Sequence, residues 1–102
     1  MATGTLRVDA PLIVEHYTVD NNTVNANSAL SVNFNNIGKT GYTTVGIVGA
    51  AISNATSSGT GSVYCAIKAF FAIGTTATLA IKNTNNSAAK VMAEIYVLYQ
   101  KN

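Results

Sequence analysis

The sequence predicts an all-β protein, an antiparallel β-sandwich of about six to eight strands. Apolar segments recur about every 8–14 residues, turns rich in Gly, Asn and Ser separate them, and no segment has the 3.6-residue period of an amphipathic helix. A chain of 102 residues suffices for one core. We assign residues 12–102 to this domain and residues 1–11 to a lead-in, which is a linker, an edge strand or the end of a stalk.

The first third of the chain contains two or three of the predicted strands. Residues 12–19 (LIVEHYTV) form a strand without a clean apolar face, and residues 20–22 (DNN) have the chemistry of a turn. Residues 23–36 hold one strand or two short ones. The clearest part is residues 29–34, where apolar and polar side chains alternate. A loop is expected over residues 35–41.

The stretch Gly38–Ser53 begins with this loop and continues as a strongly apolar segment. The apolar part is too short for a membrane-spanning helix, which needs about 20 residues, so we expect no membrane insertion. We predict instead a strand over residues 43–53 that is covered on both faces. Gly46 and Gly49 lie inside it, and glycine inside a strand indicates the close approach of another backbone or of a bulky side chain.

The second half of the chain predicts three further strands, with a long polar hairpin loop over residues 54–61. The strand over residues 63–73 is predicted to have one wholly apolar face, formed by Val63, Cys65, Ile67, Ala69, Phe71 and Ile73. Its other face is mixed and consists of Tyr64, Ala66, Lys68, Phe70 and Ala72. Turns over 74–76 and 83–87 flank a strand over 77–82. The residues of that strand predicted to face the core are Ala77, Leu79 and Ile81.

The last predicted strand, residues 90–100, is apolar on both faces. One face consists of Val91, Ala93, Ile95, Val97 and Tyr99, and the other of Met92, Glu94, Tyr96, Leu98 and Gln100. The second face is too apolar for a solvated sheet, which indicates a homo-oligomer. Its interface is predicted to contain Gly46, Gly49, Tyr64, Phe70, Met92, Tyr96 and Leu98.

Composition excludes some classes of partner. Charged residues make up 10% of the chain, against about 25% in a typical soluble protein. The six basic residues are scattered, so we expect no nucleic-acid partner. A neutral polar surface is common in extracellular and virion-surface β proteins. The single Cys65 is expected to be a buried, inert thiol. The N-terminus shows no signal-peptide pattern, which indicates either a protein outside the general secretory route or a fragment of a longer one.

Groups for catalysis or metal binding are few, so we expect no enzyme, no metal and no cofactor. Glu15 and the only histidine, His16, are neighbours in a predicted strand and therefore point to opposite faces. His16 and Cys65 lack the further ligands of a zinc site. Asp20, with the two asparagines after it, is interpreted as part of a turn because calcium needs more oxygen ligands. GKTGY lacks the earlier glycine of a phosphate-binding loop.

A shallow glycan-binding site remains the best candidate for binding. Glycan sites combine aromatic faces with neutral hydrogen-bonding groups, and the residues of this type in the predicted loops are Tyr42, Asn54, Thr56 and Ser58. The alternative is that Tyr42 packs at the base of a loop and that the polar residues only solvate a turn.

Residues from about 29 to 102 resemble the C-terminal head domains, which bind receptors, of phage and prophage tail-fibre and baseplate structural proteins. The matching segments are Gly41-Tyr42-Thr43, Gly46-Ile47-Val48-Gly49, Ser53-Asn54, Gly74-Thr75-Thr76, Ile81-Lys82-Asn83, Ser87-Ala88-Ala89-Lys90 and Tyr96-Val97-Leu98-Tyr99. The chain departs from the pattern at Thr44, where proline is frequent, and at Ala50, where an aromatic residue is frequent.

The resemblance implies a trimeric, jelly-roll-like fibre tip that is assembled in the host cytoplasm, is displayed on the virion surface and binds a polysaccharide or another envelope component of a bacterial host. Two other hypotheses stay open. The chain is a purely structural head-fibre, decoration or shaft-capping module without a ligand, or it is an enzyme such as a depolymerase, for which the sequence offers little support.

Overall fold

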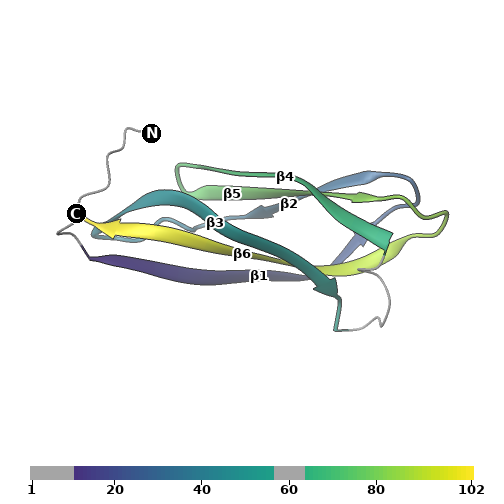
Figure 1. Ribbon diagram of the computed structural model, residues 1–102, viewed down its shortest axis with the longest axis horizontal. Coiled ribbons are helices and arrows are strands. Elements are labelled where there is room, and N and C mark those ends of the chain that lie inside the picture. Colours follow the sequence, from purple (N-terminus) through teal and green to yellow (C-terminus); the bar gives the residue numbers. More distant parts are fainter. Residues whose placement is uncertain (1–10, 57–63) are drawn as a thin grey trace.

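The computed structural model describes residues 11–56 and 64–102 of the chain. These residues form six strands: β1 (Leu12–Val24), β2 (Ala29–Phe34), β3 (Tyr42–Asn54), β4 (Cys65–Ile73), β5 (Thr76–Asn83) and β6 (Ala89–Lys101). Two antiparallel sheets of three strands each face one another, with the orders β1-β6-β3 and β2-β5-β4 (Figure 1). The predicted all-β, antiparallel fold is confirmed. The described part of the chain contains no helix long and apolar enough to cross a membrane.

The long axis of the molecule follows three long strands. β1, β3 and β6 each contain 13 residues, and at about 3.4 Å per residue such a strand is about 44 Å long. The described part of the chain measures 49 × 22 × 20 Å. A residue at one end of β3 is therefore far from a residue at the other end.

The core lies between the two sheets and follows the predicted alternation. Every second residue of β5 and β6 is buried, and the largest fully buried apolar side chains are Val24, Ile37, Leu79, Ile81, Val91, Ile95, Val97 and Tyr99. Burial of each Val, Ile or Leu side chain stabilises the fold by about 1.5–3 kcal/mol. The core faces predicted for residues 29–34, 77–82 and 90–100 are confirmed.

The turn predicted at residues 20–22 is wrong, because β1 continues through it to Val24. The pairing of β1 with β6 shifts between Val19 and Asn22, which marks a β-bulge, and Asn21 has a φ of 57°. The Asn22 side chain donates to the Val19 carbonyl at 2.6 Å and to the Val91 carbonyl at 3.1 Å. Asparagine tolerates the left-handed region both in turns and in bulges, so local chemistry does not distinguish the two.

The wholly apolar face predicted for residues 63–73 is also wrong. A bulge between Ile67 and Ala69 reverses the alternation, so that Phe70 pairs with the buried Leu79. Phe71 and Ile73, which were predicted to share the wholly apolar face with Ile67, are 52% and 73% exposed. Val63 lies outside the described residues.

The burial predicted for both faces of residues 43–53 is wrong for a single chain. β3 carries two bulges, one between Thr44 and Gly46 and one between Ile47 and Gly49. The additional residues of these bulges, Val45 and Val48, are 43% and 58% exposed. β3 therefore contacts the core on its inner face and leaves apolar side chains on the surface.

Different structural constraints explain why glycine occupies positions 46 and 49 of β3. Gly46 has a φ of 154°, and a Cβ atom there would meet no other atom within 4 Å. Its backbone conformation, not crowding, explains the glycine. A Cβ at Gly49 would lie 3.4 Å from the Tyr96 ring on the neighbouring strand. A bulky side chain thus covers Gly49, as predicted.

Buried Asn83 connects the two sheets at one end of the molecule. Its side-chain amide donates to the Val24 carbonyl at 3.1 Å and to the Ser87 carbonyl at 2.9 Å, and its side-chain oxygen accepts from the Asn85 amide at 2.9 Å. Buried polar groups need such partners, because each unsatisfied group costs about 1–3 kcal/mol. Asn83 therefore holds the connection between β1 and β2 against the connection between β5 and β6.

Candidate functional site

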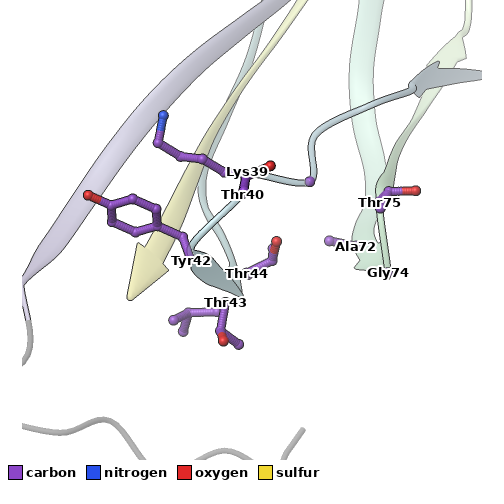
Figure 2. A pocket seen from close by; sticks show the side chains of 11 residues that line it. Lys39, Thr40, Tyr42, Thr43, Thr44, Ala72, Gly74 and Thr75 are labelled. Carbon is purple, nitrogen blue, oxygen red and sulfur yellow. The ribbon is translucent and has the colours of Figure 1, made fainter. Parts of the chain in front are cut away.

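An open groove lies at the opposite end of the molecule from Asn83. It has a volume of about 720 Å³ and lies between the segment that leads into β3 and the turn between β4 and β5 (Figure 2). Its lining residues are Gly38, Lys39, Thr40, Tyr42, Thr43, Thr44, Val45, Gly46, Ala72, Gly74 and Thr75. β3 and β4 are edge strands of different sheets, so the groove lies at an open side of the two-layered structure.

Hydrogen bonds to Ile37 hold the two walls of the groove together. The Ile37 side chain is fully buried, and its backbone amide donates to the Thr75 carbonyl at 2.9 Å. The Tyr99 hydroxyl donates to the Ile37 carbonyl and shares a 2.5 Å hydrogen bond with the Tyr17 hydroxyl. A side chain at Gly38 would collide with Thr75, because a Cβ there would lie 2.8 Å from its methyl carbon. These contacts join the segment before β3 to the turn between β4 and β5.

Burial and hydrogen bonding keep the Tyr99 hydroxyl protonated. Burial is the main cause that raises the pKa of Tyr99 above its ordinary value, and the hydrogen bond with Tyr17 raises it further. The neutral phenol can then donate to Ile37. Tyr99 is consequently a structural support of the groove.

A tight turn positions Tyr42 at the start of β3. The Tyr42 amide donates to the Lys39 carbonyl at 3.1 Å, and Gly41 has a φ of 82°, a value that glycine adopts without strain. The Nζ atoms of Lys39 and Lys101 lie 5.5 Å and 5.3 Å from the centroid of the Tyr42 ring, within cation–π range. Lys39 also forms a 3.2 Å ion pair with Glu15.

Much of the Tyr42 side chain is already occupied by the protein itself. The ring is partly buried and packs against the core. Figure 2 shows the ring and the Lys39 side chain directed away from the turn that contains Ala72 and Thr75. Tyr42 therefore forms one border of the groove. Its contacts also agree with the alternative prediction, in which Tyr42 packs at the base of a loop.

The groove is lined mainly by neutral polar groups. Four threonines contribute to it: Thr40, Thr43, Thr44 and Thr75. Thr44 lies between Tyr42 and Ala72 in Figure 2. Hydroxyl groups both donate and accept, so this lining suits a ligand that itself carries hydroxyl groups.

The predicted glycan site is not formed as one unit. Tyr42 begins β3 and Asn54 ends it, so they lie about 40 Å apart at about 3.3 Å per residue. Thr56 lies beyond Asn54, and Ser58 lies outside the described residues. Sequence reasoning grouped Tyr42 with polar residues that lie at the far end of β3, whereas the fold brings the turn at residues 72–75 beside it. The threonines next to Tyr42 were the available local signal.

Asp20 and Thr56 meet at the far end of β3. The Thr56 hydroxyl donates to Asp20 Oδ2 at 2.6 Å, and the Asn21 amide donates to Asp20 Oδ1 at 2.7 Å. The hydrogen bond from the Thr56 side chain is the largest cause of the lowered pKa of Asp20. Asp20 thus links the bulge in β1 to the end of β3. No group of three or more His, Cys, Asp or Glu side chains that could hold a metal ion occurs in the parts of the chain that the structure describes.

Glu15 and His16 point to opposite faces of β1, as predicted. Glu15 pairs with Lys39, whereas His16 Nε2 lies 3.1 Å from Glu94 Oε1 and the His16 ring stacks on Tyr96 at 4.5 Å. His16 therefore lies on the outer face of the first sheet, away from the groove.

The thiol of Cys65 is partly buried, and this burial raises its pKa. A thiol with a raised pKa is a poor nucleophile, which agrees with the expected inert role.

Exposed apolar side chains gather in two places. The outer-face patch (Leu12, Val14, Val48 and Tyr96) lies on the β1-β6-β3 sheet, and the β4 patch (Phe71 and Ile73) lies on the outer face of the edge strand of the other sheet. Of the predicted interface residues, Tyr96 belongs to the outer-face patch, Phe70 is 47% exposed on the inner face of β4, and Tyr64 is exposed just before β4. Met92 and Leu98 are partly buried on the same strand as Tyr96. Sequence reasoning missed the remaining members, because the bulges that expose Val48, Phe71 and Ile73 leave no clear local pattern.

No family model, curated protein or solved structure matches the chain.

Proposed function

We propose that this chain is a head domain of a phage-type fibre or tail tip, a jelly-roll-like sandwich that forms a homotrimer and binds polysaccharide on a bacterial host without catalysis. The observation that carries the proposal is the apolar surface left on both sheets of a chain whose core is already complete. A protein that works as a monomer rarely leaves two such patches in water. The domain would be displayed on the virion surface.

The groove supplies the glycan site of this proposal. Its threonine hydroxyls can exchange hydrogen bonds with sugar hydroxyls, and Tyr42 gives it an aromatic border. Such an open site binds weakly on its own. Three linked copies would raise the effective affinity by about 10²–10⁴ when they engage one surface together. Few charged residues suit recognition by shape and neutral hydrogen bonds.

The test is binding of fluorescently labelled protein to candidate host cells, with purified cell-wall polysaccharide as competitor. Thr40→Val and Thr44→Val each remove a hydroxyl from the groove and keep the side-chain shape. Because one hydrogen bond contributes about 0.5–1.5 kcal/mol, the double variant should bind about tenfold more weakly. Thr23→Val is the matched control, since the exposed Thr23 lies near the other end of β1. If Thr23→Val loses as much binding as the double variant, the groove is not the glycan site. The same conclusion holds if purified polysaccharide does not compete with the cells for the labelled protein.

A second candidate function is a purely structural module that decorates a head fibre or caps a shaft. The observation that favours it is the engagement of the Tyr42 ring by Lys39, Lys101 and the core, which leaves less of the ring for a ligand. This function predicts that the protein assembles but labels no host cell and no glycan on an array.

A further inference from the structure

The β4 patch lies on an edge strand that carries little protection against pairing. Among the described strands, β4 pairs with β5 alone, so its other side is open there. Natural edge strands are usually guarded by charged residues, proline or a bulge. Lys68 and the bulge beside it guard the first half of β4, but the five residues from Ala69 to Ile73 are all apolar. The second half of β4 is therefore an exposed apolar edge that is suited to contact with another molecule.

The outer-face patch is a complementary surface on the other sheet. It is the broad face of three long strands, and the edge strand β3 carries glycines in place of side chains. The Tyr96 ring covers Gly49, but the position above Gly46 is open, since a Cβ there would meet no atom within 4 Å. An aromatic side chain from another molecule would fit over an uncovered glycine, as aromatic residues do within sheets.

Charges beside the two patches are opposite in sign. Lys68 precedes the β4 patch, and within the described ranges no carboxylate pairs with it. Glu94 neighbours Tyr96 on the outer face of β6, where its Oε1 lies 3.1 Å from His16 Nε2. Like charges juxtaposed across an interface cost several kcal/mol, whereas opposite charges favour the encounter. The two patches are thus matched in charge and in apolar character.

We infer that the β4 patch of one copy packs on the outer-face patch of the next copy, in a head-to-tail contact. If the same patch of two copies met, the second patch of each copy would stay in water. In a head-to-tail contact, the β4 patch of one copy covers the outer-face patch of the next, so one kind of interface covers both patches. Such contacts close into rings when the rotation between copies allows it, and three copies make the smallest ring beyond a dimer. The inference rests on the proposed assembly and specifies its surface.

The decisive test is disulfide trapping in a Cys65→Ser background. One cysteine replaces Val14 or Val48 of the outer-face patch, and the other replaces Phe71 or Ile73 of the β4 patch. Under mild oxidation, at least one of the four double variants should give a ladder of covalent dimers and trimers, and none of the single variants should cross-link. Covalent dimers of a single variant, or no cross-link in any variant that still assembles, would overturn the head-to-tail contact.

Charge reversal gives a second test that does not require a covalent bond. Lys68→Glu and Glu94→Lys should each weaken assembly at least tenfold in analytical ultracentrifugation, and the double variant should regain most of the loss. Lys90→Glu is the control, because Lys90 is exposed near the start of β6, remote from Tyr96. Additive losses in the double variant would overturn the inference. If the wild-type chain stays monomeric at high micromolar concentration, the assembly in the proposed function fails as well, whereas a negative trapping result with an intact trimer leaves that function standing.

Discussion

The side-chain amide of Asn83, at the end of β5, lies 3.1 Å from the carbonyl oxygen of Val24, at the end of β1. The two residues belong to different sheets, and both are fully buried. The same amide also donates to Ser87, so one side chain connects the ends of β1 and β5 to the turn before β6. This buried amide defines the relative position of the two sheets at its end of the molecule.

Asn83→Ala should therefore destabilise the fold by about 2–4 kcal/mol, because buried carbonyls lose their donors and a cavity forms. Urea denaturation followed by circular dichroism measures the change. Asn86→Ala, at an exposed position three residues later, should change the free energy of unfolding by less than about 0.5 kcal/mol. Similar losses in the two variants would show that the buried network contributes little.

The stability of the wild-type protein should fall at alkaline pH because of Tyr99. Burial raises the pKa of Tyr99 in the folded state, whereas the unfolded value is about 10. Above that pH the unfolded state releases a proton that the folded state retains, so the free energy of unfolding decreases as pH rises. Below about pH 10 the contribution is intact. Urea denaturation at a series of pH values from about 8 to 11 measures this slope.

Tyr99→Phe serves as the matched variant for that experiment. It removes the hydrogen bonds to Ile37 and Tyr17 and should cost about 1–3 kcal/mol near neutral pH. It should also flatten the alkaline decrease. An unchanged alkaline slope in Tyr99→Phe would assign the decrease to other groups.

Gly46 and Gly49 should respond differently to alanine. Gly46→Ala should cost about 1–3 kcal/mol although nothing crowds the position, because its φ of 154° is one that side-chain-bearing residues rarely adopt. Gly49→Ala should cost less, since the Tyr96 ring at 3.4 Å is in ordinary van der Waals contact and needs to move little. Chemical denaturation of both variants measures the order. The reverse order would mean that crowding, not backbone conformation, selects the glycines.

The Asp20 carboxyl group should titrate below its ordinary pKa, and Thr56→Val should move the midpoint upward. The hydrogen bond from Thr56 is the largest cause of the lowered pKa. A lowered folded-state pKa means that Asp20 stabilises the fold above about pH 4 and that this contribution disappears as pH falls through the folded-state value. NMR titration of the carboxyl carbon measures both midpoints, with Thr23→Val as a variant that should leave the midpoint in place. If Thr56→Val leaves the Asp20 titration midpoint unchanged, the hydrogen bond from Thr56 is not the cause of the lowered pKa.

The sequence by itself determined the fold class, the core faces of β2, β5 and β6 and the opposite orientations of Glu15 and His16. These features depend on the two-residue alternation of a strand, which is local and visible in the order of residues. Val91, Ile95 and Tyr99, for example, could be assigned to the core from β6 alone. The trimer and the glycan ligand stay predictions.

Only the tertiary structure decided which apolar residues remain on the surface and where the groove lies. One additional residue in a bulge reverses every side chain after it, so Phe71 and Ile73 leave the predicted apolar face and lie on the surface. Tyr42 lies near Ala72 and Thr75 instead of Asn54 because β3 is a continuous strand and the β4–β5 turn folds back beside its start. Pairing between distant strands determines both outcomes, and no local pattern records that pairing.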